Sequence, residues 1–207
     1  AKNMMMKWTR GNSESYVNLF SFDNAGTFTS TKSQRVTVSS YGYTDLIKGP
    51  GNLFISAEQG YKRRDNVNRW GLLVSTLSTD GKDDVHVVDT ERMTQNVTDN
   101  NNSYYRSPSI TALNDSIYAI GYRGDSYDGF IETFKVETSG KITRLKSYEY
   151  DVNESNYNKL VRVDSNTVAM IYRGFKGQWG GHVLTFDIAT DGSSITEVAS
   201  KLLHNSG

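Results

Sequence analysis

Residues 109–151, SITALNDSIYAIGYRGDSYDGFIETFKVETSGKITRLKSYEYD, form the stretch that decides the fold. Four short, mostly apolar runs alternate there with segments rich in Asn, Asp, Ser and Gly. Short runs bounded by turn residues are typical of β-strands joined by hairpins. The stretch therefore predicts a four-stranded antiparallel meander, with strands at 109–113, 117–122, 130–136 and 142–150.

The rest of the chain repeats this unit, and two glycine landmarks carry the repeat. One glycine ends each second strand and usually follows an arginine: Gly11, Gly60, Gly124 and Gly174. The other lies in the turn after each third strand: Gly26, Gly81, Gly140 and Gly192. Recurring four-stranded units of about 50 residues are typical of propeller blades.

The predicted fold is therefore an all-β β-propeller, a single domain over residues 1–207 with four antiparallel four-stranded blades. The repeats span approximately 3–36, 44–92, 109–151 and 159–203, and the first lacks its innermost strand. Two explanations of the missing strand remain open: the chain is cut from a longer array, or another segment or subunit supplies the strand. Because an unfinished sheet has open edges, self-assembly through open blade edges is expected.

The apolar pattern predicts how each strand is buried. Second strands, such as residues 117–120 and 168–171, are apolar on both faces, which is typical of strands packed between two sheets. Third strands alternate, as half-buried strands do, and fourth strands are more polar. No sustained 3.6-residue apolar period occurs, so no long helix is expected. Residues 61–69 and 90–107 are predicted to be loops.

Composition excludes some functions and favours one location. The 23 basic residues equal the 23 acidic ones, which argues against nucleic-acid binding. No apolar run is long enough for a membrane span, so no membrane insertion is expected. The cysteine-free chain is rich in Tyr and Gly, which favours an extracellular or cell-surface location. N-x-S/T triplets begin at four candidate glycosylation sites: Asn96, Asn101, Asn114 and Asn153.

Residue types for catalysis are sparse. The three histidines have no metal-ligand spacing, and no local motif suggests a catalytic triad. The sequence therefore predicts no enzyme activity, no metal and no cofactor. A weaker alternative is a glycoside hydrolase or lyase, because several propellers are glycosidases. That alternative requires two carboxylates about 5–10 Å apart in a concave pocket.

The loops between second and third strands are the best candidates for ligand binding. Each carries an aromatic residue near the third strand, and three begin with an arginine. Exposed rings stack on sugars, and arginines bind the carboxylates of acidic sugars. The alternative is structural, with the same side chains sealing the gaps between blades. The candidate residues are Arg10, Tyr16, Trp70, Arg123, Tyr127, Arg173 and Trp179.

Three segments of the third repeat, YAIGYRG (118–124), DGFIETFKV (128–136) and SGKIT (139–143), carry a family resemblance. They resemble tandem repeats of about 50 residues in secreted and surface-layer-type proteins of archaea and environmental bacteria. Repeat two departs most, with Gln59 in place of the arginine. The resemblance implies a non-catalytic extracellular scaffold or adhesion module with other surface subunits or glycans as partners. A glycan-binding lectin is the alternative function.

Overall fold

The computed structural model describes residues 2–10, 14–37, 40–64, 67–79, 85–93 and 107–205. Over these residues the chain is all-β, with fifteen strands in four antiparallel sheets. The one helical element in the described ranges is a short 3-10 turn, η1 (Asp125–Tyr127). The predicted all-β class with four-stranded antiparallel sheets is confirmed.

Each sheet is a meander of consecutive strands. Sheet 1 has three strands, β1 (Lys2–Arg10), β2 (Glu14–Phe22) and β3 (Phe28–Thr37). Sheet 2 contains β4 (Ser40–Lys48), β5 (Phe54–Arg64), β6 (Val67–Thr79) and β7 (Val85–Arg92). Sheet 3 contains β8 (Ser109–Ala112), β9 (Ile117–Arg123), β10 (Gly129–Val136) and β11 (Ile142–Asp151). Sheet 4 contains β12 (Ser155–Arg162), β13 (Thr167–Phe175), β14 (Trp179–Ile188) and β15 (Ile195–Asn205).

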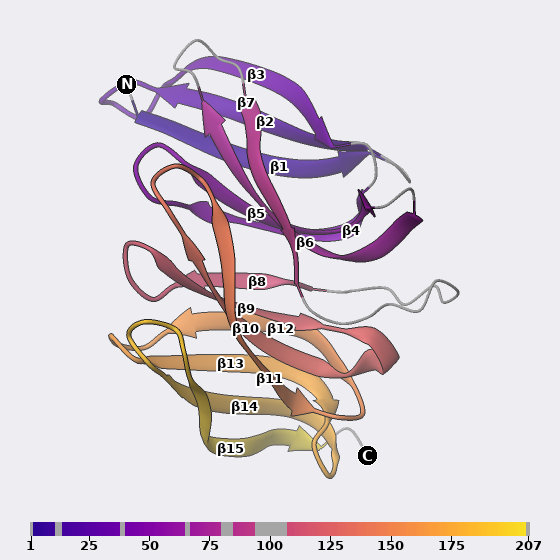
Figure 1. The fold of residues 1–207 in the computed structure, drawn as a ribbon. Coiled ribbons are helices and arrows are strands. Elements are labelled where there is room, and N and C mark those ends of the chain that lie inside the picture. The colour runs from indigo at the N-terminus through magenta and orange to yellow at the C-terminus, as the bar shows by residue number, and fades with distance from the viewer. Residues whose placement is uncertain are drawn as a thin grey trace.

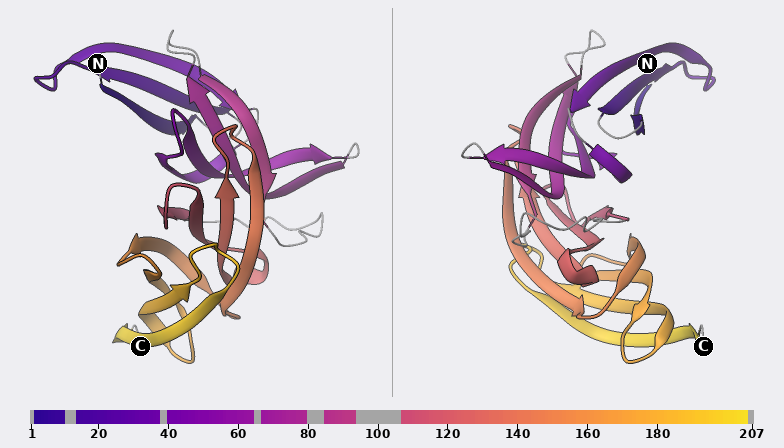
Figure 2. Two further views of the ribbon diagram at one scale, coloured as in Figure 1. Left: turned by 60° about the vertical axis from the view of Figure 1, so that its left-hand side comes forward. Right: turned by 90° about the vertical axis from the view of Figure 1, so that its right-hand side faces the viewer.

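The four sheets follow one another from sheet 1 at the top of Figure 1 to sheet 4 at the bottom. Figure 2 shows that together they form an arc. The first strands β4, β8 and β12 lie next to one another along one edge of the arc. The fourth strands β7, β11 and β15 lie along the other edge, together with β3. Strand order within each sheet therefore runs across the arc in the same direction throughout.

Apolar side chains fill the space between neighbouring sheets in three clusters, one for each pair of sheets. Every residue of β9 is buried, because sheets 2 and 4 cover its two faces. The burial predicted for both faces of second strands is wrong for β13. There Met170 and Tyr172 are buried but Ile171 is 52% exposed. In the described structure only one face of sheet 4 packs against another sheet.

Residues 61–69 are predicted to be an enlarged loop, but residues 61–64 and 67–69 instead belong to strands β5 and β6, which form a hairpin. Backbone pairing continues from Tyr61 with Trp70 to Arg64 with Val67. Figure 2 shows this hairpin projecting from the stack. The prediction was wrong because charged residues suggested a loop, whereas a ladder of backbone hydrogen bonds does not depend on an apolar pattern. Similarly, β7 continues to Arg92, and residues 94–106 of the second predicted loop lie outside the described residues.

A repeated contact, here named the turn joint, holds the turn glycines Gly140 and Gly192 against the preceding sheet. The Thr76 hydroxyl of sheet 2 donates to the Gly140 carbonyl of sheet 3 over 2.6 Å. The Thr133 hydroxyl of sheet 3 donates to the Gly192 carbonyl of sheet 4, also over 2.6 Å. Both glycines have positive φ, 91° and 76°, as a tight turn requires. Neighbouring sheets are therefore held by hydrogen bonds as well as by apolar packing.

A bulge residue completes each turn joint. Val88 and Leu145 are the extra residues at the β6–β7 and β10–β11 bulges. A Cβ added at Gly140 would lie 2.6 Å from Val88 Cγ1, and one at Gly192 would lie 2.7 Å from Leu145 Cδ1. The bulges thus direct an apolar side chain onto the next sheet's turn, where only glycine fits.

A second repeated contact, the first-strand joint, links the first strands. The backbone N–H of Ile110 donates to Asp45 Oδ2 over 2.7 Å. The N–H of Leu160 donates to Ser109 Oγ over 3.1 Å. In both joints a polar side chain of one first strand accepts a bond from the first strand of the next sheet.

Candidate functional site

The uncovered face of sheet 4, here named the terminal face, is defined by Val161, Ile171, Thr185 and Val198. Val161 and Thr185 both pair across the sheet with Ala169, so they share its face. Val161, Ile171 and Val198 are exposed, Val198 to 63%. The opposite face, which carries Leu160, is buried against sheet 3. An apolar surface grouped on one sheet face is typical of an interaction site.

Arg123, one of the candidates from the loops between second and third strands, is buried between sheets 3 and 4. Its Nη1 donates to Asn156 Oδ1 over 2.7 Å. Its guanidinium lies 4.0 Å from the centre of the Tyr127 ring. Arg123 thus occupies the gap between sheets 3 and 4.

Tyr127 is 55% exposed and rests on this arginine. Ser126 and Tyr127 both have positive φ, 55° and 75°. The left-handed region costs non-glycine residues about 1–2 kcal/mol each. The turn therefore holds an aromatic ring outward at an energetic cost.

The corresponding residues of sheet 4 are arranged differently. Trp179 is 42% exposed and contacts Phe175 edge to face, with ring centres 5.5 Å apart. Arg173 is exposed, unlike Arg123 at the equivalent position. The two arginines therefore have different environments, and only in sheet 3 does the arginine support the exposed ring.

The remaining candidates lie on strands of the first two sheets. Tyr16 is half-buried on β2. Arg10 ends β1 and Trp70 lies within β6, not in a loop, and the side chains of both lie outside the described residues. A ligand-binding role for the seven candidates remains a prediction.

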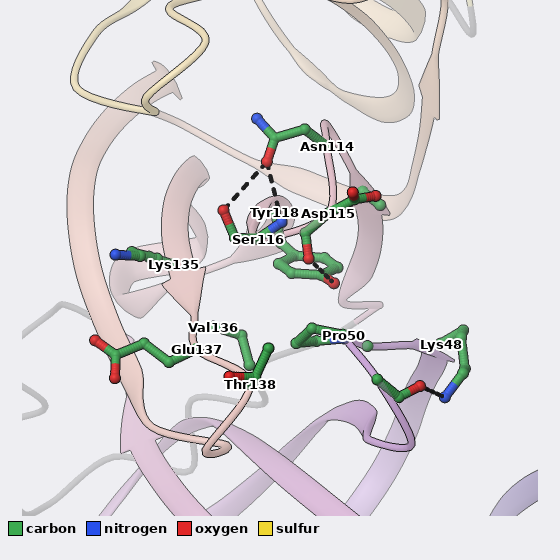
Figure 3. Close-up of a pocket in the computed structure, with 13 residues that line it drawn as sticks. Lys48, Pro50, Asn114, Asp115, Ser116, Tyr118, Lys135, Val136, Glu137 and Thr138 are labelled. Atoms are coloured by element: carbon green, nitrogen blue, oxygen red, sulfur yellow. Dashed lines mark hydrogen bonds between the residues drawn. The ribbon is translucent and has the colours of Figure 1, made fainter.

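A pocket of about 790 Å³ lies between sheets 2 and 3, among turns that the sequence analysis did not select. Figure 3 shows residues 48–51, 114–116 and 136–138 around it. Two lysines and two acids line it: Lys48, Lys135, Asp115 and Glu137. The turns come from segments far apart in the sequence, so no single motif could have revealed the pocket.

Hydrogen bonds between side chains and the backbone hold the turns that line the pocket in place. Lys48 Nζ donates to the carbonyls of Gly51 and Leu53, and its loss of hydration lowers the pKa of this amine. Asn114 Oδ1 accepts from the N–H groups of Ser116 and Ile117, and Asn114 Nδ2 donates to the Thr190 carbonyl over 2.9 Å. The Asn114 amide is thus engaged at both ends, which disfavours glycosylation there.

Asp115 and Glu137 both line the pocket, so the hydrolase or lyase alternative remains a hypothesis. Among the described residues, no group of three or more histidine or acidic side chains could hold a metal ion. His182 is buried, with Nε2 2.9 Å from the Gln178 carbonyl and its ring stacked on Tyr172. No helix in the described ranges is long and apolar enough to cross a membrane.

Two buried tyrosines, Tyr150 and Tyr172, connect sheets 3 and 4. The Tyr150 hydroxyl lies 2.5 Å from Ser155 Oγ and donates to Asn158 Oδ1 over 2.6 Å. The Tyr172 hydroxyl donates to Asp151 Oδ2 over 2.9 Å. Burial raises the pKa of both tyrosines well above its ordinary value, and the Asp151 charge adds to the effect.

We expect these raised pKa values to make the chain unfold at alkaline pH. Above about pH 10 the unfolded state loses phenolic protons that the native state keeps, so stability falls as pH rises. Each tyrosine contributes a slope of up to about 1.4 kcal/mol per pH unit. Urea unfolding at increasing pH should show a smaller slope for Tyr150→Phe than for wild type. The exposed-site control Tyr157→Phe should keep the wild-type slope, and equal slopes in all three proteins would refute the explanation.

Neither a protein-family model nor a curated protein sequence matches the chain. Among solved structures, the chain is similar to a crystal structure of a protein from Lactobacillus plantarum, with a TM-score of 0.61 and 9% identity. The match covers 99% of this chain but 54% of that one, so the chain spans about half its length. At this identity the likeness shows the fold alone.

Proposed function

We propose that this chain is a non-catalytic β-propeller module of four blades that serves as a structural or adhesive subunit of a larger cell-surface assembly. The terminal face carries the proposal. Its valines and isoleucine are exposed, whereas apolar faces between sheets inside the chain are buried. A face of this kind is stabilised when a partner covers it.

Three further observations support the proposal. Each sheet is a meander, and equivalent strands lie along the same edge of the arc, as in propeller blades. The turn joint repeats between sheets 2, 3 and 4. The cysteine-free composition, rich in Tyr and Gly, and the resemblance to surface repeats favour an extracellular location.

Fractionation of cells that produce the chain tests this function. The wild-type chain should sediment with the cell envelope as part of a large assembly. Val198→Lys should release it, because a lysine in an apolar contact is costly to bury. Val152→Lys, at an exposed valine between β11 and β12, should behave as wild type. A wild-type chain recovered as a free monomer from the cytoplasm would contradict the proposal.

Glycan binding is the second candidate function. The observation that favours it is the exposed Tyr127 ring, held outward in a left-handed conformation on the buried Arg123. Strained conformations often mark binding sites, and exposed aromatic faces stack on sugars. Trp179 adds a second exposed ring on the next sheet.

If the loops between second and third strands bind glycans, Trp179→Ala and Tyr127→Ala should each weaken binding about fivefold, since a stacked ring contributes about 1 kcal/mol. Glycan-array screening followed by titration would measure the change. Tyr127→Phe keeps the ring and should bind as wild type if stacking carries the affinity. Absence of binding by the wild-type chain to any glycan would rule against this candidate.

A further inference from the structure

We propose that the terminal face of one chain binds sheet 1 of a second copy, head to tail, so that two copies close into a ring of eight sheets. This inference rests on the proposed assembly function and names the partner. The interface would reproduce the joints that already connect the sheets within one chain.

Sheet 4 carries the half of a turn joint that contains the threonine and the bulge residue. Thr185 occupies the position of Thr76 and Thr133, because each of the three threonines pairs with the residue directly after a bulge. Val198 is the bulge residue of sheet 4, as Val88 and Leu145 are in sheets 2 and 3. The terminal face therefore contains Thr185 and Val198, the two side-chain types that hold a turn glycine in the other joints.

Sheet 1 carries the other half of the joint. Gly26 lies in the β2–β3 turn with a φ of 84°, matching Gly140 and Gly192. A Cβ added at Gly26 would meet nothing within 4 Å, whereas at the other two glycines it would collide with the preceding sheet. Asp23 Oδ1 accepts from the N–H groups of Ala25 and Thr27, which orders the turn. The Gly26 turn therefore has the conformation of the turns that insert into a preceding sheet, and no sheet in the described residues receives it.

The aromatic face of sheet 1 matches the faces that pack inside the chain. Val17 faces sheet 2, so alternation places Tyr16 and Phe20 on the opposite face of β2. The SYVNLFSF segment of β2 aligns with GFIETFKV of β10, where the corresponding Phe130 and Phe134 are buried against sheet 2. Phe28, in edge-to-face contact with Phe20, is 61% exposed. Sheet 1 thus has aromatic side chains at the positions where the aromatic side chains of sheet 3 pack against sheet 2.

Two details indicate a partner sheet that lacks a first strand, as sheet 1 does within the described part of the chain. The first is Lys159, which lies 50 residues after Ser109, the same interval that separates the landmark glycines of sheets 3 and 4. Asp45 and Ser109 accept an N–H from the next first strand. Lysine has no acceptor atom, so the terminal face cannot form a first-strand joint from this side chain. A three-stranded partner has no first strand, so its contact with sheet 4 would not require a first-strand joint.

The second detail is Ile171, which stands where sheet 3 has Gly121. A Cβ at Gly121 would lie 3.1 Å from Met170 Sδ on the second strand of the next sheet and 3.3 Å from Leu160 Cδ1 on its first strand. A partner without a first strand has no leucine at that position, so one of these two contacts is absent. Both details therefore favour a second copy over a further four-stranded sheet.

Two copies of this chain together have about the length of the matching solved chain. The matching solved chain is almost twice as long as the part that aligns with this chain. A head-to-tail contact forms a ring if its rotation closes and a filament if it does not. The arc in Figure 2 curves in one direction from sheet 1 to sheet 4, as a closing contact requires.

Sedimentation equilibrium on the purified full chain is the first test. Wild type and Val152→Lys should have twice the mass of one chain. Val198→Lys on the terminal face and Phe28→Lys on sheet 1 should each weaken dimerisation about 100-fold or more, because a charge would be buried in an apolar joint. Circular dichroism establishes that the variants fold, and Thr185→Lys provides a second variant of the terminal face.

Cross-linking identifies which faces meet. Since the chain has no cysteine, Val198→Cys and Ala25→Cys introduce single thiols on the two faces. A mixture of the two variants should form a disulfide-linked dimer under mild oxidation, and neither variant alone should. Linking of Val198→Cys to itself would show a tail-to-tail contact and overturn the proposal, as would a monomeric wild type.

Higher oligomers with the head-to-tail link would overturn two-copy closure. A monomeric purified chain that still sediments with the envelope in cells would refute the second copy as partner but leave the proposed assembly function standing. A wild-type chain that is a dimer when purified but does not sediment with the envelope in cells would refute the proposed function without contradicting the proposed dimer.

Discussion

Gly174→Ala is expected to destabilise the chain by about 3 kcal/mol or more, because overpacking against backbone cannot be relieved by a rotamer change. The added Cβ would lie 2.0 Å from the Glu154 carbonyl oxygen and 2.5 Å from Tyr172 Cε2. The Phe175 N–H donates to this carbonyl over 3.2 Å, which holds it in place. Thermal unfolding should show a decrease of about 6–12 °C for a chain of this length.

Two other glycines of sheet 4 provide matched controls. A Cβ at Gly181 would meet nothing within 4 Å, so Gly181→Ala should change stability by less than about 0.5 kcal/mol. Gly177 is equally open but has a φ of 78°, so Gly177→Ala should cost about 1–2 kcal/mol through backbone strain alone. A decrease for Gly174→Ala no larger than that for Gly177→Ala would show that the carbonyl contact does not matter.

Asp151→Ala is expected to cost about 3 kcal/mol, because it leaves the buried Tyr172 hydroxyl and two partly buried N–H groups without their acceptor. Asp151 is buried and accepts from the Tyr172 hydroxyl over 2.9 Å and from the N–H groups of Asn153 and Glu154 over 3.0 and 3.3 Å. Chemical denaturation would measure the loss. Because Asp151 also lies beside Gly174, the two substitutions should not be additive.

Asp164→Ala is the control for this prediction. Asp164 Oδ1 accepts from the N–H groups two and three residues later, as Asp151 does, but the side chain is exposed. Water can replace the carboxylate there, so the loss of stability should be much smaller. Equal losses at the two positions would mean that local turn geometry, not burial, accounts for the cost of Asp151→Ala.

The site was less predictable than the fold. Tyr127 and Trp179 are exposed near the starts of third strands, but the sequence did not distinguish the buried Arg123 from the exposed Arg173. The difference depends on Asn156, which comes from another sheet and accepts a bond from Arg123. The pocket between sheets 2 and 3 was missed because its turns converge only after folding.

The sequence by itself determined the strands and their grouping, because turn residues and apolar runs act over a few residues and repeat along the chain. Residues 109–151 were sufficient to predict the four strands of sheet 3, which the structure has at nearly the same positions. The recurring turn glycines were recognised as hairpin residues. Their positive φ values at Gly26, Gly140 and Gly192 agree with that role.

Only the tertiary structure decided how the sheets contact one another and which face is left uncovered. Thr133 and Gly192 are 59 residues apart, and nothing local indicates that one donates a hydrogen bond to the other. Ile171 has the same apolar character as residues of a buried strand, yet it is exposed because no described sheet follows sheet 4. Burial is a property of the neighbours in space, and local sequence patterns do not specify those neighbours.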